Sequence, residues 1–263
     1  MSAGWAAAAV FAIAVVMTMA GRGGGNYYVL LQILAGTSMH VAASTGQFLM
    51  AATSLAAMII FQRKRVVAWR MALFIGLTTS VMAFVGGFVA HGVDGRTLKM
   101  VFAVLLVFAG GLMLFPARER TGAPRTGAFI WRLRSGEEHY AVDLRIALPV
   151  ALGTGLFAGM VGVSGGSFLV PLMVLACGLP MRLAVGTASV MVAATALMGF
   201  LGHFSRGVFD AAWVLPQAAA AIAGGILGGK LTLQVKPKAL KKVFAITTLA
   251  AAILVFWHAW GAR

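Results

Sequence analysis

The sequence predicts an all-α integral membrane protein made of two inverted repeats of about five helical segments each, with short or broken helices at the repeat interface. Hydrophobic side chains make up 61% of the 263 residues and charged side chains only 10%, whereas a soluble domain carries about 25% charge. The apolar residues form continuous runs, several of them near the ~20 residues that a helical crossing requires. The two halves of the chain also resemble each other.

The apolar runs define the expected helices. They span residues 3–20, 27–36, 41–61, 66–90 and 98–115 in the first half, and 146–163, 168–177, 183–203, 209–233 and 240–260 in the second. Between the halves lies a hydrophilic stretch rich in Arg, Gly and acidic residues. We therefore expect a membrane repeat at residues 1–115, a cytoplasmic linker at 116–145 and a second membrane repeat at 146–263.

The halves align through their glycine-rich turns. Residues 21–25 (GRGGG) match 162–166 (GVSGG), and residues 51–53 (AAT) match 193–195 (AAT). Internal duplication is a signature of secondary transporters. The first apolar run has no basic residues before it, unlike a cleavable signal peptide, so we expect it to be retained as a helix.

Basic residues predict the orientation of the repeats. The loop at 63–70 has four basic residues and its counterpart at 205–210 has one, whereas the loop at 236–242 is more basic than its counterpart at 94–99. Because Lys and Arg favour cytoplasmic loops, equivalent loops are expected on opposite sides of the membrane. The prediction is a multi-pass protein of a bacterial-type inner membrane, with inverted repeats and both termini outside.

One run in each half is too short to cross a bilayer comfortably. Residues 27–36 and 168–177 each follow a glycine-rich turn, and such paired, interrupted segments point to a transporter's midplane site. Glycines bring backbone N–H groups to the start of a half-helix, where the helix dipole favours an anion. All six acidic residues fall in loops or at run ends, which disfavours a buried cation site.

The candidate substrate-binding residues belong to the two turns and to the polar clusters that begin the next helices. They are Arg22, Gly23, Gly24, Gly25, Asn26, His40, Ser44, Thr45, Gln47, Ser164, Gly165, Gly166, Ser167, Thr187 and Ser189. Arg22 would either complement an anion or snorkel to the interface. His40 would contact substrate, carry a proton or be a satisfied interfacial histidine. The alternative for the small residues is close helix packing, with each hydroxyl bonded to its own helix.

The second-half motif carries a resemblance to a known family. Residues 155–166 (GLFAGMVGVSGG), Pro171 and residues 184–189 (AVGTAS) resemble the TauE/SafE sulfite exporter family, and the likeness extends over nearly the whole chain. It implies a permease for sulfite, sulfonates such as sulfoacetate, or related organosulfur anions, with no bound cofactor and no metal. We expect export by alternating access. The first half departs from the motif, since Arg22 stands where the other repeat has Val163.

Three alternatives stay open: transport of another small anion, a non-transporting membrane scaffold, and an intramembrane protease. Gly162 to Gly165 has the GxSG form of rhomboid proteases, in which Ser164 would be the nucleophile and His203 its base. The partner repeat has Gly23 in place of the serine, so we expect no catalytic residue and no enzyme activity. The net charge of +15 is explained by topology, not nucleic acid. The expected partners are the lipid bilayer and a small sulfur-containing anion, with proton coupling left open and the oligomeric state unspecified.

Overall fold

The structure is a computed structural model that describes residues 3–98, 100–101, 104, 129–135, 138–163, 165–205, 209–240, 242–243, 246–247 and 250. Its helices are α1 (Ala3–Met19), α2 (Gly25–Leu34), α3 (Met39–Arg63), α4 (Trp69–Val89), α6 (Leu144–Val161), α7 (Gly166–Pro171), α8 (Met181–Phe204) and α9 (Ala211–Gln234). A 3-10 turn, η1 (Ala90–Gly92), follows α4, and a π-helical turn, η2 (Leu172–Ala176), continues α7. The strands are β1 (Ile130–Ser135) and β2 (Glu138–Asp143).

The helices coincide with the apolar runs of the sequence, and the class of helical, multi-pass membrane protein is confirmed. Within the described residues, five helices are long and apolar enough to cross a membrane: α3, α4 with η1, α6, α8 and α9. The remaining apolar segments, α1, α2 and α7 with η2, are shorter. Most of the runs predicted at 98–115 and 240–260 lies outside the described residues.

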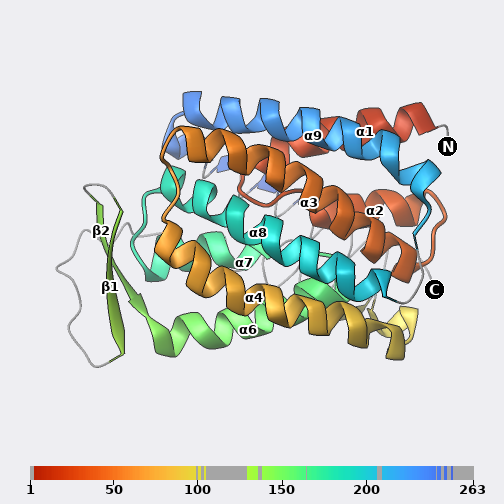
Figure 1. Cartoon of the computed structure of the whole chain (residues 1–263). Coiled ribbons are helices and arrows are strands. Elements are labelled where there is room, and N and C mark those ends of the chain that lie inside the picture. The colour runs from red at the N-terminus through yellow and green to blue at the C-terminus, as the bar shows by residue number, and fades with distance from the viewer. Residues whose placement is uncertain are drawn as a thin grey trace.

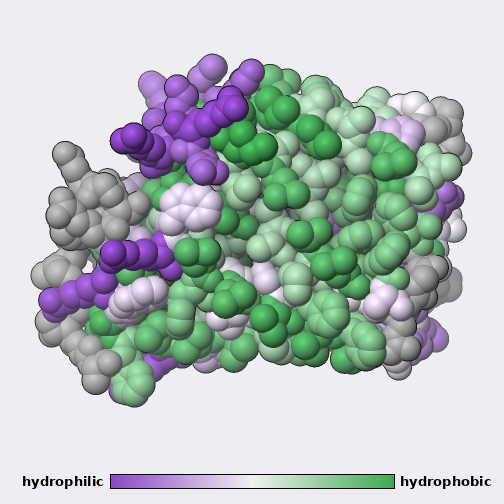
Figure 2. Space-filling model, viewed as in Figure 1, coloured by the Kyte–Doolittle hydropathy of each residue, from purple (hydrophilic) through white to green (hydrophobic). Residues whose placement is uncertain are grey.

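The helices form one bundle with α3 and α8 at its centre (Figure 1). On one side α4 packs against both α8 and α6, and on the other α9 packs against both α3 and α1. In Figure 1, α3 and α9 end near the β-strands, whereas α4, α6 and α8 end at the opposite end of the bundle. Figure 2 shows an apolar surface over the middle of the molecule, with hydrophilic residues gathered mainly at the end that carries the strands.

Glycines set the close spacing of these helices. A β-carbon at Gly159 would overlap the Ala83 carbonyl oxygen on α4, and one at Gly225 would overlap the Thr53 carbonyl oxygen on α3. Small residues that let helix backbones approach are the usual way membrane helices gain van der Waals contact, because lipid tails remove the hydrophobic drive for association.

The segment expected as a linker contains a β-hairpin, which the sequence analysis did not predict. β1 pairs antiparallel with β2, and Leu133 lies opposite Tyr140 in the register. Leu133, Tyr140 and Val142 are buried in the same apolar cluster as residues of α4, α6 and α8. The strands do show the alternation of apolar with polar residues that is typical of a half-buried strand. The segment contains many arginines, so its overall composition indicated a hydrophilic linker instead.

Candidate functional site

Both short segments begin at glycine-rich turns, as the sequence predicts. After α1 the chain passes through Gly21, Gly23 and Gly24, all with positive φ, and Gly24 at φ 90° is the residue before α2. After α6 it turns at Gly162, with φ 77°, and α7 begins at Gly166. Left-handed backbone is readily adopted only by glycine, which accounts for the glycines at Gly21, Gly23, Gly24 and Gly162.

The two turns are joined by a buried arginine. The Arg22 side chain is 1% exposed, and its Nε and Nη2 donate to the Ser167 Oγ at 3.0 and 2.7 Å. Ser167 is itself 2% exposed and lies in the first turn of α7. This hydrogen bond connects residues 145 positions apart, so the first half's turn supplies a guanidinium to the start of the second half's short helix. Arg22 does not snorkel to the surface.

Each turn also packs on the long helix of the other half. A β-carbon at Gly21 would lie 3.0 Å from the Val185 Cα on α8, and one at Gly162 would lie 2.6 Å from the Ala43 Cα on α3. Gly21 aligns with Gly162, and Ala43 aligns with Val185. The two contacts are therefore counterparts of each other, and they hold both turns at the centre of the bundle.

The space beside the turns differs between the halves. A β-carbon at Gly24 would lie 2.8 Å from the Tyr28 ring, and one at Gly23 would overlap the Ser54 Oγ. At Gly165, where φ is −57°, a β-carbon would meet nothing closer than the Thr154 Cγ2 at 3.4 Å. The first turn is closed by its neighbours, and the second has room for a methyl group.

Several polar groups of α3 face the protein interior. Ser44 and Gln47 are fully buried, and Gln47 Nε2 donates to the Ala158 carbonyl at 2.6 Å. The Ser44 Oγ, the Gln47 Oε1 and the Ser54 Oγ are buried without a hydrogen bond among the described residues. Buried polar atoms are normally satisfied, so such atoms beside a broken helix are candidates for contact with substrate or water. Sequence reasoning missed Ser54, although it directly follows the AAT stretch that occurs in both repeats.

The hydroxyls of α8 are engaged elsewhere. Thr187 Oγ1 donates to the Leu183 carbonyl at 2.6 Å and accepts from the Ala68 N–H at 2.9 Å, which anchors the start of α4. Ser189 Oγ donates to the Val185 carbonyl at 3.0 Å. These contacts match the packing alternative for both residues.

Five predicted site residues remain to be located. Gly25, Asn26 and Gly166 are buried at or next to the turns, and Thr45 is buried on α3. Ser164 lies outside the described residues, so the geometry of a Ser164 and His203 pair is not described.

His40 belongs to a cluster of three histidines. Its ring stacks on His91 of η1 with centroids 5.3 Å apart, and His91 meets His203 of α8 edge-on at 5.4 Å. His203 Nε2 is 2.8 Å from the Gly159 carbonyl oxygen, next to the Ala158 carbonyl that Gln47 binds. His203 of the cluster and Gln47 of α3 therefore lie at adjacent carbonyl groups of α6. Among the described residues no group of His, Cys, Asp and Glu is placed to hold a metal ion.

Three described carboxylates, Asp94, Asp143 and Asp210, lie just before helical segments. Asp143 and Asp210 accept from the backbone N–H groups of Arg145 and Trp213 and cap α6 and α9. Asp94 accepts from Thr97 through its hydroxyl at 2.7 Å and its backbone N–H at 2.9 Å, and these bonds lower the pKa of Asp94 below its ordinary value. The position of these carboxylates agrees with the expectation from the sequence.

A buried amide network was not predicted from the sequence. Gln32 Nε2 donates to Gln217 Oε1 at 2.8 Å, and Trp213 Nε1 donates to Gln32 Oε1 at 2.9 Å. Both glutamines are at most 1% exposed. The network connects the short helix α2 to α9. The sequence feature that could have indicated it is Gln32, a glutamine inside a ten-residue apolar helix.

Comparison with known proteins gives a consistent family. Residues 6–255 match the family model described as sulfite exporter TauE/SafE. A probable membrane transporter protein of Xylella fastidiosa (strain Temecula1) is 30% identical over 250 residues, covering 90% of this chain and 89% of that protein. The probable membrane transporter protein YunE of Bacillus subtilis is 20% identical over 245 residues, with 89% of this chain and 90% of that protein covered. No solved structure matches the chain.

Proposed function

The chain belongs to the sulfite exporter TauE/SafE family and is a multi-pass membrane transporter, and on that premise we propose that it is a permease that exports small sulfur-containing anions such as sulfite or a sulfonate. The observation that carries the proposal is the buried contact between Arg22 and Ser167 at the meeting point of the two glycine turns. An ionisable residue within membrane-spanning structure is a functional site by default, because it is expensive to bury.

The chemistry of the turns suits an oxyanion. A guanidinium presents a planar fork of N–H donors that matches the oxygens of a sulfite or sulfonate group. The starts of α2 and of α7 with η2 add backbone N–H groups and the positive end of the helix dipole. An anion that binds Arg22 would share its donors with Ser167 or displace that hydroxyl. The proposed core of the site comprises Arg22, Gly23, Gly24, Gly25, Asn26, Ser44, Thr45, Gln47, Ser164, Gly165, Gly166 and Ser167, with His40, Thr187 and Ser189 at its edges.

Alternating access through inverted repeats is part of the proposal. It is supported by the counterpart contacts of Gly21 on Val185 and Gly162 on Ala43, and by the packing of α4 on α6 and α8, which corresponds to that of α9 on α1 and α3. In Figure 1 the equivalent helices α3 and α8 run in opposite directions. Transporters of this kind move one repeat against the other around a fixed midplane site. The proposed location is a bacterial-type inner membrane with both termini outside.

We include proton coupling in the proposal because of the histidine cluster. His40, His91 and His203 come from three different elements, and the His91 ring contacts the other two. Histidine is the side chain whose charge ordinarily changes between pH 5 and 8. A proton taken up by the cluster would place a positive charge one peptide from the Gln47 side chain and so favour anion entry.

The proposed substrate class is tested by flux into proteoliposomes that contain the purified protein. Sulfite, sulfoacetate, sulfate, phosphate and chloride are supplied in turn at equal concentration and pH. We expect uptake of sulfite or sulfoacetate above the other anions, and loss of that uptake in Arg22→Gln, whereas the matched variant of an exposed arginine, Arg96→Gln, keeps it. Equal rates for all five anions, or a preference for chloride or phosphate, would contradict the proposed substrate and leave the alternative of another small anion.

A further inference from the structure

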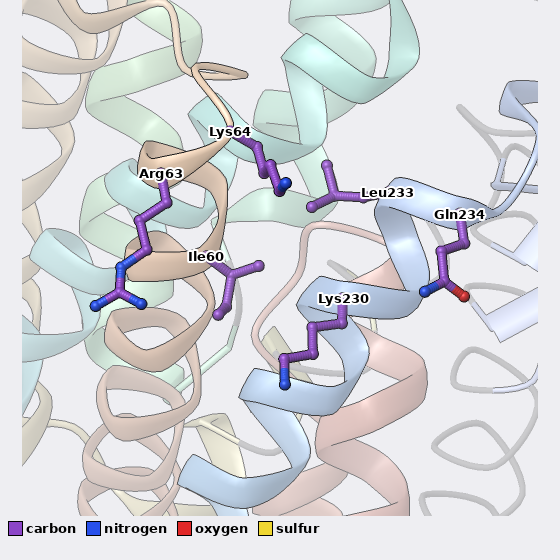
Figure 3. A pocket seen from close by; sticks show the side chains of 6 residues that line it. All are labelled: Ile60, Arg63, Lys64, Lys230, Leu233 and Gln234. Carbon is purple, nitrogen blue, oxygen red and sulfur yellow. The ribbon is translucent and has the colours of Figure 1, made fainter.

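A second polar site lies at the end of the bundle, away from the glycine turns. A cavity of about 430 Å³ opens where α3 and α9 finish (Figure 3). The residues that line it are Ile60, Arg63, Lys64, Lys230, Leu233 and Gln234. Three cations, one amide and two apolar side chains from the ends of α3 and α9 therefore line one cavity, and none of these lining residues is a carboxylate.

Helix electrostatics account for only part of this cluster. Arg63 is in the last turn of α3 and Lys64 is its C-cap, where the helix dipole favours positive charge. Lys230, by contrast, lies before the last turn of α9, so neither the dipole nor a loop position explains why it faces the same cavity. Cations that line one cavity repel one another, and an anion bound among them would reduce that repulsion.

The cavity lies at the boundary between the polar end of the protein and its apolar flank. One turn before Arg63, Ile59 is 48% exposed on α3, and one turn before Lys230, Ile226 is 37% exposed on α9. The two helices pack closely beside the cavity, since a β-carbon at Gly229 would lie 3.3 Å from the Ile60 Cβ. In a bilayer, exposed apolar side chains at this position contact acyl chains while the basic groups lie at headgroup level.

We propose that this cavity binds the phosphate of an anionic glycerophospholipid, with the acyl chains lying along the exposed apolar side chains of α3 and α9. Basic pockets between membrane helices suit such headgroups. A dissolved phosphate would use Arg63, Lys64 and Lys230 but would gain nothing from the apolar flank. The site is separate from the glycine turns, so its occupancy does not depend on which anion the protein transports.

The test measures lipid binding to the purified full-length protein in detergent. Thermal unfolding midpoints and native mass spectra are recorded with dioleoyl phosphatidylglycerol, with dioleoyl phosphatidylcholine and with inorganic phosphate. The pocket variant is Lys64→Gln/Lys230→Gln, and the control is Lys236→Gln/Lys238→Gln, which removes two exposed lysines outside the cavity. A charge-retaining variant, Lys64→Arg/Lys230→Arg, completes the set.

We expect phosphatidylglycerol to bind and stabilise the wild-type protein more than phosphatidylcholine does, and inorganic phosphate to have no comparable effect. At about 1 kcal/mol for each basic residue near an anionic headgroup, the pocket variant should bind phosphatidylglycerol roughly 30-fold more weakly. The control and the arginine variant should keep the wild-type preference. Equal weakening in the pocket and control variants would overturn the proposal, because attraction would then be diffuse. Equal stabilisation by inorganic phosphate would also overturn it, because the site would then take a soluble anion.

Discussion

Replacing Arg22 separates a role in binding from a role in folding. Methionine has a similar length and no charge, so Arg22→Met removes the guanidinium while filling much of its space. The variant loses the hydrogen bonds to the Ser167 Oγ at 3.0 and 2.7 Å, which contribute about 1.5 to 3 kcal/mol because the donor is charged. It also removes a charge that is 1% exposed, and the desolvation of a buried ion costs several kcal/mol.

These two terms oppose each other, so the expected change in stability is small. The thermal unfolding midpoint of Arg22→Met in detergent should equal or exceed that of the wild-type protein. Transport should fall by about tenfold to a hundredfold, because the substrate loses a charge-assisted hydrogen bond of ~1.5 to 3 kcal/mol. The assays are a thermal shift measurement and sulfite flux in proteoliposomes, with flux expressed per folded protein.

A double-mutant cycle with Ser167 sharpens this result. Ser167→Ala alone leaves the buried guanidinium without that acceptor and should lower the unfolding midpoint, whereas Ser167→Ala/Arg22→Met should recover it. If Arg22→Met unfolds the protein, or if its flux per folded molecule equals the wild-type value, then Arg22 is a structural residue and the proposed anion site is wrong.

Three further results are expected. Single cysteines at Arg63 and at Ser205, in a chain whose native cysteine has been replaced, should be labelled from opposite sides of the membrane by an impermeant thiol reagent, because α3 and α8 end at opposite ends of the bundle. Gly24→Ala should lower the unfolding midpoint, since left-handed backbone costs alanine about 1 to 2 kcal/mol and its β-carbon would lie 2.8 Å from a ring; Gly165→Ala should leave the midpoint unchanged or raised and reduce flux alone. His203→Gln should weaken the response of flux to an imposed proton gradient, because it removes one imidazole of the cluster.

Each of these predictions has an outcome that would contradict it. Labelling of both cysteines from the same side would refute inverted repeats. A Gly165→Ala variant that keeps full flux would show that the second turn does not approach substrate. A His203→Gln variant that keeps normal flux and an unchanged response to the proton gradient would remove the histidine cluster from proton coupling.

The sequence was sufficient for the parts of the fold that depend on local composition. Apolar runs located the long helices because a bilayer requires continuous apolar length, and glycine turns located α2 and α7 because left-handed backbone needs glycine. The hairpin at Ile130–Ser135 and Glu138–Asp143 was missed. Its buried residues are few and lie among many arginines, so their alternation with polar residues was overlooked, and burial against the bundle stabilises the hairpin.

The sequence could not predict which side chains form hydrogen bonds within the candidate site. Thr45 and Ser44 of α3 align with Thr187 and Gly186 of α8. Thr187 is held by Ala68 and Leu183, whereas the Ser44 Oγ has no hydrogen bond among the described residues. The difference arises from which helix packs beside each residue. A repeat alignment identifies equivalent positions, but only the packing decides which hydroxyl is available.

The two halves differ at the glycine turns, and this difference suggests how a single anion could bind between two proposed inverted repeats. Arg22 aligns with Val163, so only the first half supplies a cation at this position. The Arg22 guanidinium donates to the Ser167 hydroxyl of the second half. The first turn is packed tightly around Gly23 and Gly24, whereas the second has free space around Gly165. In the proposed site, a closely packed donor on one side and an open turn on the other would hold a single anion away from the proposed two-fold axis. Substrate release would then require separation of Arg22 from the start of α7, which is a movement of one half relative to the other.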